Sequence, residues 1–238
     1  MHPLRTEVAF LLPALVLAAL LAGCSAESDP APPPPPPAPP VGPATPGQLV
    51  QAFQTVYETM SAEEHARLLD AAFIMPLQSR TVATFPDLGP AIELAEALRI
   101  HERLFSQQDV VDPDQQAVEA VQAIAFQTFE PRGDWAEAAQ GSAYPGTVNA
   151  LFDVVMLFDR GGLPSMLKVQ GTLRFHVARR DTVVNGVSGT YCRLRAISDL
   201  TDDTKLAAGG ADKSIADKSI ADKSVETISL GRLLGLWR

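Results

Sequence analysis

The sequence predicts an α+β fold in which about four N-terminal helices pack on a C-terminal antiparallel β-meander of three or four strands. Three observations predict this class. Apolar residues recur at three- and four-residue spacing before residue 131, they alternate with polar residues after residue 146, and an Asn-Gly pair then offers a hairpin turn. Helices followed by antiparallel strands are typical of α+β folds.

The first predicted helix begins at Thr45 and Pro46, because threonine can cap a helix and proline fits its first turn. Its apolar positions are Leu49, Phe53, Val56 and Met60. A second helix is predicted from the capping box formed by Ser61 and Glu64 to about Ala72. Each helix should therefore bury one face.

The third predicted helix follows Gly89-Pro90, and the fourth follows Asp112-Pro113 and ends at Pro131. The apolar positions of the third are Ile92, Ala95, Leu98 and Leu104. Those of the fourth are Val118, Val121, Ile124 and Phe129. Both sets have the spacing of one helical face.

Two strands are predicted next. Residues 149–158 are apolar on both alternating faces apart from Asp153, as expected for a strand that is covered on both sides. Residues 168–179 alternate more cleanly, with Leu173 and Phe175 on the apolar face. The pattern therefore changes from helical to strand-like within one domain.

The Asn-Gly pair at 185–186 favours a two-residue hairpin turn, and the turn sets a register for the strands on either side. In that register Val177 faces Leu194. Phe175 faces Ala196. Both pairs fall on the apolar face, so the turn and the alternation agree.

Basic residues gather on the opposite face of this hairpin, although the whole chain carries a formal net charge of −9. The candidate residues are Lys168, Arg174, His176, Arg180, Arg193 and Arg195. The predicted register places His176 opposite Arg195. This face is a solvated sheet surface, or it pairs with acidic side chains of the helical half, or it is a site for an anionic ligand or an acidic partner. Arginine suits the last interpretation because its planar fork binds phosphate and carboxylate groups bidentately.

Residues 1–23 are predicted to be a cleaved export signal. A polar head containing Arg5 precedes an apolar run from Val8 to Leu21, which is shorter than the roughly 20 residues that a transmembrane helix needs. Two small residues, Ala22 and Gly23, then precede a cysteine.

The tetrapeptide Leu21-Ala22-Gly23-Cys24 resembles the lipobox of bacterial lipoproteins. The resemblance implies cleavage before Cys24, lipidation of its thiol and a place in the bacterial cell envelope. Ser25 is compatible with onward transport to the outer membrane or the cell surface. The alternative is that Cys24 merely follows a conventional cleavage site.

The rest of the chain divides by composition. Residues 24–47 are a proline-rich tether that favours an extended polyproline II conformation, and the α+β domain covers 48–206. Within 207–224 the repeat ADKSI, ADKSI, ADKSV matches neither a helical nor a strand period, so a loop is predicted there. Residues 225–238 are predicted to return as a strand and an apolar tail.

The order of helices followed by a meander resembles the NTF2-like, or cystatin-like, group. In that group helices pack into a curved sheet and enclose a conical pocket. The resemblance allows a small pocket enzyme that uses His176 with Asp153 or Asp159 as an acid–base pair. The spacing of His65, His101 and His176 does not match a metal site, and no catalytic, metal or cofactor-binding residue is assigned.

These features predict a membrane-anchored envelope lipoprotein with a non-catalytic accessory or binding module. Its partners would be the membrane, through the lipid anchor, and an envelope protein or an anionic glycan or lipid. The acidic composition argues against nucleic acid as a partner. The alternatives are the pocket enzyme and a purely structural module.

Overall fold

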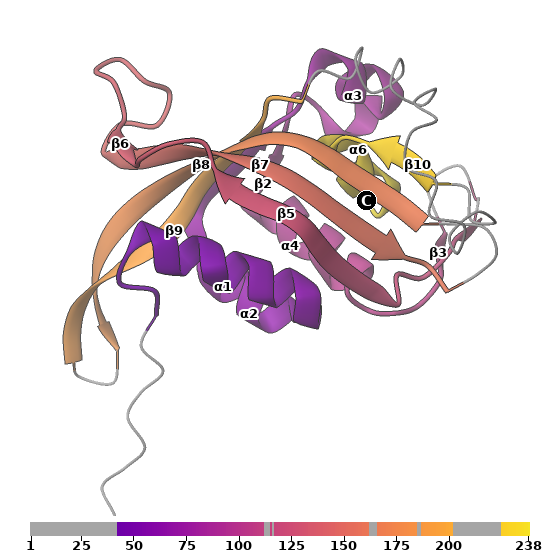
Figure 1. Ribbon diagram of the computed structural model, residues 1–238, viewed down its shortest axis with the longest axis horizontal. Coiled ribbons are helices and arrows are strands. Elements are labelled where there is room, and N and C mark those ends of the chain that lie inside the picture. The colour runs from indigo at the N-terminus through magenta and orange to yellow at the C-terminus, as the bar shows by residue number, and fades with distance from the viewer. Residues whose placement is uncertain (1–41, 112–114, 116, 162–165, 185–186, 202–224) are drawn as a thin grey trace, which may run out of the picture. The chain divides into compact units, whose positions relative to one another are not determined.

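A computed structural model describes residues 42–111, 115, 117–161, 166–184, 187–201 and 225–238 (Figure 1). The helices are α1 (Pro46–Thr59), α2 (Ala62–Leu68), α3 (Ser79–Thr84), the 3-10 helix η1 (Pro86–Leu88), α4 (Leu94–Leu104) and α6 (Leu230–Leu236). The strands are β1 (Leu69–Pro76), β2 (Ala91–Glu93), β3 (Val110–Val111), β4 (Ala117–Val118), β5 (Ala123–Pro131), β6 (Ala136–Glu137), β7 (Thr147–Asp159), β8 (Met166–Val184), β9 (Val187–Asp199) and β10 (Val225–Ile228). The predicted signal, Cys24, most of the tether, the Asn-Gly turn and the repeat lie outside these ranges.

The predicted fold class is wrong, because the described chain is dominated by one large mixed sheet. Among the described residues this sheet has eight strands in the order β2-β1-β9-β8-β7-β5, with β10 beside β8 and β6 beside β7. β1 pairs with β9, and β10 pairs with β8, in parallel, whereas the other pairs in this sheet are antiparallel. The helices are therefore additions to a sheet that begins at Leu69, and no four-helix layer precedes the strands in the described ranges.

The helix predicted from Ser61 ends earlier than expected. The Ser61 hydroxyl accepts a hydrogen bond from the Glu64 amide, as a cap should, but the Glu64 carboxylate pairs with Arg67 and does not return to Ser61. The chain then leaves the helix at Leu69 and becomes β1. By contrast, the complete capping box at the start of α1 joins Thr45 to Gln48.

The fourth predicted helix is wrong, because the described part of its range contains strands β4 and β5. A β-bulge contributes to the helix-like spacing within β5. Phe126 faces Met156, and Thr128 faces Val155, so Gln127 is an extra residue in the pairing with β7. The bulge breaks the two-residue repeat, so the inward side chains on the two sides of it are three residues apart.

β7 and β8 pair with each other, and along its other edge each pairs with two strands in succession. β8 pairs with β10 near residue 167 and with β9 beyond residue 173, while β7 pairs with β6 at one end and with β5 at the other. The two predicted strands at 149–158 and 168–179 lie within β7 and β8. The expected cover on both sides of β7 is wrong, because alternate residues of this strand are fully buried on one face and half-buried on the other.

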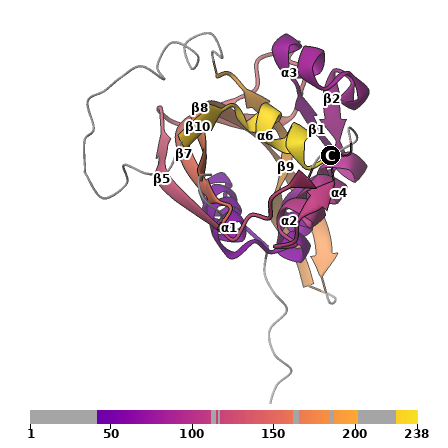
Figure 2. The same ribbon diagram turned by 90° about the vertical axis from the view of Figure 1, so that its right-hand side faces the viewer.

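The hydrophobic core lies on the inner face of the curved sheet, where α1 packs (Figure 2). The ring of Phe53 in α1 meets the edge of Phe175 in β8, with centroids 5.2 Å apart. Trp237, which follows α6, is fully buried, so the C-terminal residues complete the core. Large side chains thus fill the side of the sheet on which a conical pocket would be expected.

Candidate anion-binding site

Five of the six predicted basic residues lie where β8 pairs with β9. Arg174 and His176 point away from α1, because Phe175 between them points into the core. We call this side of the sheet the outer face. Arg180, Arg193 and Arg195 share it. Lys168 is also on this face, but six residues of strand, roughly 20 Å, separate it from Arg174, so the structure does not bring it to the others.

A β-bulge decides how the histidine and the arginines meet. Val177 faces Leu194, which confirms that part of the predicted register. The register then shifts by one residue, so His176 faces Ala196 and Phe175 faces Ile197. The predictions that His176 lies opposite Arg195 and that Phe175 lies opposite Ala196 are therefore wrong. Arg195 is the extra residue of the bulge.

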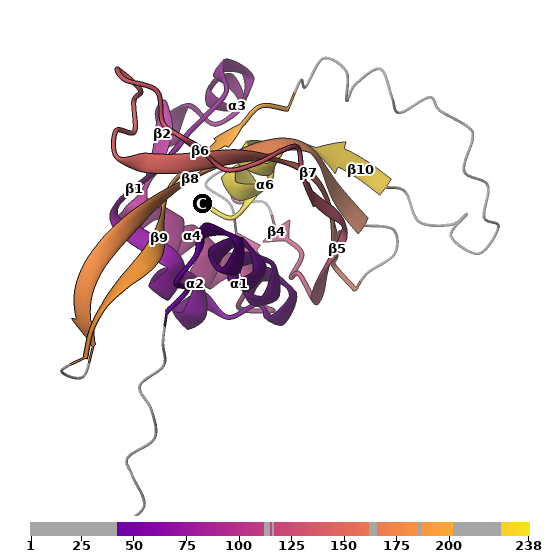
Figure 3. The ribbon, with the colours of Figure 1, turned by 60° about the vertical axis from the view of Figure 1, so that its left-hand side comes forward.

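Tyr144 covers the two basic side chains at the bulge. It belongs to the connection between β6 and β7, which lies on the side of β8 away from α1 (Figure 3). Its ring centroid is 4.5 Å from that of His176 and 5.8 Å from the guanidinium carbon of Arg195. We call Arg174, His176, Arg195 and Tyr144 the donor cluster.

Three nitrogens of the donor cluster are buried without a hydrogen-bond partner in the part of the chain that the structure describes. They are Nε of Arg174, Nδ1 of His176 and Nη1 of Arg195. His176 as a whole is only 6% exposed. An unsatisfied buried polar group costs about 1–3 kcal/mol of stability. These donors therefore favour a bound partner, such as a water or an anion.

The electrostatics of the donor cluster favour an anion. Burial, followed by the charge of Arg174, lowers the pKa of His176 to about 4, so this histidine is neutral near pH 7. Arg174 and Arg195 therefore carry the positive charge, and neither forms an ion pair with a carboxylate of the described residues. A negatively charged group would find both donors and uncompensated charge here.

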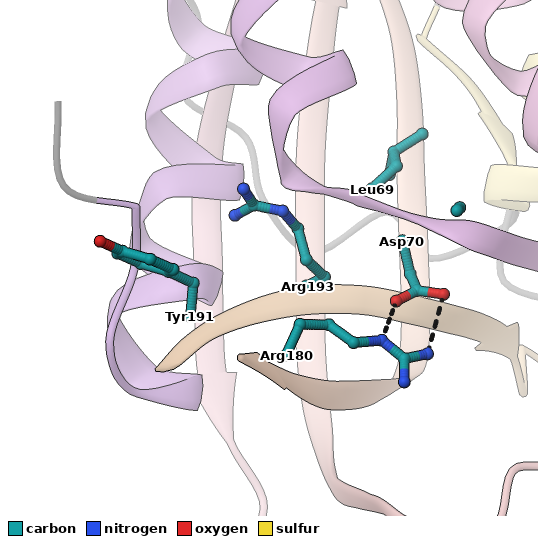
Figure 4. A pocket seen from close by; sticks show the side chains of 6 residues that line it. Leu69, Asp70, Arg180, Tyr191 and Arg193 are labelled. Carbon is teal, nitrogen blue, oxygen red and sulfur yellow. Dashed lines mark hydrogen bonds and ion pairs between the residues drawn. The ribbon is translucent and has the colours of Figure 1, made fainter. Parts of the chain in front are cut away.

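A cleft of about 230 Å³ is lined by residues of β1, β8 and β9 (Figure 4). Its lining residues are Leu69, Asp70, Ala71, Arg180, Tyr191 and Arg193. Asp70, which is 4% exposed, accepts hydrogen bonds from Nε and Nη2 of Arg180 at 2.7 and 3.2 Å. Arg193 forms no ion pair within the described ranges, and Figure 4 shows no contact between it and the Asp70–Arg180 pair.

The ionisation of Asp70 links the cleft to the donor cluster. Burial opposes its charged form, but hydrogen bonds from Arg180 and the Ala72 amide, with the charges of Arg180 and Arg195, lower the pKa of Asp70 overall. Arg180 is thus the one member of the predicted set that an acidic residue of the described chain neutralises. Asp70 lies on strand β1, so this ion pair joins two strands and does not join the basic face to the helices.

The acid–base pair allowed by the pocket-enzyme interpretation does not form. The Asp153 carboxylate accepts hydrogen bonds from Arg132 and Thr172, and Asp159 accepts one from the Gly161 amide. His176 lies opposite Asn149 on β7. No described carboxylate therefore orients His176, and its pKa is lowered rather than raised.

Sequence reasoning missed Asp70 and Tyr144. Asp70 lies in a segment that was predicted to be helical, and that prediction does not place it near β8. Tyr144 lies in a polar turn, and the sequence around it does not indicate which residues its ring contacts. Both approach the basic residues only through the tertiary fold, and no local pattern could have identified them.

Within the described ranges, no group of three or more His, Cys, Asp or Glu side chains is placed to hold a metal ion. None of the described helices is both long enough and apolar enough to cross a membrane. Cys192 is a buried free thiol, and burial raises its pKa.

The comparisons with known proteins found similar solved structures but no sequence relative. No family model matches the chain, and no curated protein matches its sequence. Among solved structures, a proposed aromatic ring hydroxylase from Novosphingobium aromaticivorans is 12% identical, with a TM-score of 0.42, over 64% of this chain and 83% of that one.

Two further structural neighbours are named as NTF2-like. A protein of unknown function in nutrient uptake from Rhodospirillum rubrum is 13% identical, with a TM-score of 0.37, over 66% of this chain and 97% of that one. A proposed dehydratase from Streptomyces avermitilis is 14% identical, with a TM-score of 0.37, over 64% of this chain and 90% of that one. The structural neighbours thus include the group that the element order resembles, but likeness at these scores carries no activity to this chain.

Proposed function

We propose that this protein is a lipid-anchored component of the bacterial cell envelope whose domain binds an anionic ligand and performs no chemistry of its own. The observation that carries the binding role is the set of buried, unpartnered nitrogens on Arg174, His176 and Arg195. They lie on the outer face, and the two arginines that line the cleft, Arg180 and Arg193, share this face.

The support for the anchor is the sequence Leu21-Ala22-Gly23-Cys24 and the proline-rich tether that follows it. Two or more acyl chains at Cys24 would suffice for stable membrane attachment. Ser25 favours the outer membrane or the cell surface as the location. An anchored binding module would meet envelope lipids, anionic glycans or an acidic envelope protein at high local concentration.

Binding has more support than catalysis. His176 lacks a carboxylate partner and lies on the face opposite the core, where Tyr144 covers it. The donors around it are arginines, which bind anions but are too basic to exchange protons near neutral pH. A purely structural role would leave the unpartnered donors of the cluster without an explanation.

The binding role is tested by titrating the purified full-length protein, in detergent, with phosphate, sulfate, acetate and citrate, by isothermal titration calorimetry. We expect saturable binding of at least one anion, weakened by Arg195→Gln. Arg99→Gln is the matched control, because Arg99 pairs with Glu96 on α4, away from the outer face. Binding of none of these anions, or equal loss in both variants, would overturn the proposal.

A further inference from the structure

The three unpartnered nitrogens of the donor cluster come from adjacent positions on two neighbouring strands. Arg174 and His176 are two residues apart on the same face of β8. Arg195 is the bulged residue directly before Ala196, the partner of His176. The ring of Tyr144 lies against both His176 and Arg195, and the charge of Arg174 acts on His176.

The number of donors and the charge restrict the ligand. Both guanidinium nitrogens are donors, and Nδ1 of His176 can carry the hydrogen of the neutral ring. The two arginines contribute two positive charges. Asp70, whose carboxylate interacts electrostatically with Arg195, is already bound by Arg180 and the Ala72 amide. A carboxylate offers two oxygens and one negative charge, so it would leave a donor and a charge unmatched.

On this basis the geometry points to a tetrahedral dianion, a phosphate or phosphate monoester, as the ligand of Arg174, His176 and Arg195. Such a group has three or more oxygens and about two negative charges near neutral pH. The inference rests on the proposed anion-binding function and names its ligand class and its residues. It places the ion beneath Tyr144 rather than in the cleft beside Arg193.

Entry of the ion requires the ring of Tyr144 to move aside. Most residues of the connection from 138 to 146 are exposed. Tyr144 is held by its own turn, in which its amide binds the Ser142 hydroxyl and its carbonyl accepts from the Thr147 hydroxyl. The ring can therefore swing without unpairing the main sheet.

A bound dianion would also change the ionisation of His176. The titratable and charged groups that face this ring are Arg174 on β8, Arg195 on β9 and Tyr144 from the β6–β7 connection. Asp70 on β1 acts on the site through Arg195. An anion placed among these cations favours the protonated imidazole, so binding should strengthen as the pH falls below neutrality.

The test uses the full-length protein in detergent and two probes, inorganic phosphate and sulfate. Sulfate remains a dianion over the whole range, so its pH dependence reports on His176 alone. We expect sulfate to raise the pKa of His176, followed by NMR, by about one unit or more. Arg195→Gln and Arg174→Gln should each weaken phosphate binding by roughly tenfold to a hundredfold. Acetate should bind at least about tenfold more weakly than phosphate.

Arg193→Gln separates this inference from the wider proposal. If Arg193→Gln abolishes phosphate binding while folded Arg195→Gln and Arg174→Gln keep it, the anion site is the cleft and the inference is wrong, although the binding function stands. Acetate binding as tightly as phosphate would show that the site does not select a dianion. The inference would then be wrong, although the binding function stands. If neither phosphate nor sulfate binds, the inference is wrong. The wider binding proposal falls with it only if acetate and citrate also fail to bind. Unfolded variants are identified by near-UV circular dichroism and replaced by Arg195→Lys, which keeps the charge but loses the planar fork.

Free phosphate and a lipid headgroup share this chemistry, and competition distinguishes them. Short-chain phosphatidic acid carries a phosphate monoester on an apolar body. Tighter binding of this lipid than of inorganic phosphate, with the same loss in Arg195→Gln, assigns the site to a lipid headgroup. Equal or weaker binding assigns it to free phosphate or a soluble ester. Binding of the lipid that Arg195→Gln does not weaken would contradict the inference.

Discussion

The hydroxyl of Tyr57 and Nε2 of His101 lie 2.6 Å apart in the core between α1 and α4. Nδ1 of His101 lies 2.7 Å from the Ala97 carbonyl oxygen, so Nδ1 carries the hydrogen and Nε2 accepts from Tyr57. The ring of His65 in α2 stacks on His101, with centroids 3.8 Å apart. All three side chains are buried. A neutral polar cluster therefore joins three helices beneath the sheet.

Tyr57→Phe should destabilise the protein, because it leaves Nε2 of His101 buried without a donor. The expected loss in the free energy of unfolding is about 1–3 kcal/mol, measured by urea denaturation near neutral pH. Tyr144→Phe is the control, because no hydrogen bond of the Tyr144 hydroxyl joins it to the described residues, and its loss should stay below about 0.5 kcal/mol. Equal losses in the two variants would contradict this account of the cluster.

Acid should destabilise the fold through the same cluster. Burial lowers the pKa of His101 to about 4 from its ordinary value of 6.5, and burial and the neighbouring His101 lower the pKa of His65. The unfolded chain therefore binds protons first as the pH falls below 6.5. Stability is unaffected above that value and falls, by up to about 1.4 kcal/mol per pH unit for each histidine, until the folded pKa is reached.

The measurement is the free energy of urea unfolding near pH 7 and near pH 5. The double variant His65→Gln/His101→Gln should be less stable than the native chain near pH 7 but should lose less on acidification. The same drop in both proteins would show that other groups cause the acid sensitivity.

Gly171→Ala should be strongly destabilising, because a Cβ at this position would lie 1.7 Å from Oγ1 of the buried Thr201. Overpacking of this kind costs about 1–3 kcal/mol. Gly47→Ala is the matched control. No atom lies within 4 Å of a Cβ there, and alanine favours the helix by up to about 1 kcal/mol. Thermal unfolding of both variants is the measurement, and Thr201→Gly should restore part of the stability of Gly171→Ala.

Cys24→Ala should release the protein from membranes, because the acylated thiol is the proposed anchor. The expected result is transfer of the chain from the detergent phase to the aqueous phase in detergent partitioning of cell fractions. Mass spectrometry of the native chain should show a processed terminus at Cys24 with added acyl mass. A variant that still partitions into detergent would argue against the lipid anchor.

Local signals in the sequence determined several elements of this fold. The cap at Thr45 starts α1 because a threonine hydroxyl and the Gln48 side chain satisfy amides only three residues away. The alternation in β8 and the Asn-Gly pair set the hairpin register correctly as far as Val177 and Leu194. The basic face also followed from this register. All of these features depend on neighbours within a few residues or across one turn.

Contacts between distant segments decided the rest. The parallel pairing of β1 with β9 converts the end of a predicted helix into a strand and brings Asp70 to Arg180, which is 110 residues away. The bulges at Gln127 and Arg195 change which side chains share a face. The alternation of polar and apolar residues in a strand does not show where such an extra residue is inserted. Tyr144 meets His176 only once the sheet is formed. The sequence by itself determined which residues could be buried or charged, and the tertiary structure decided which of them meet, because pairing energy between strands depends on partners that no local pattern specifies.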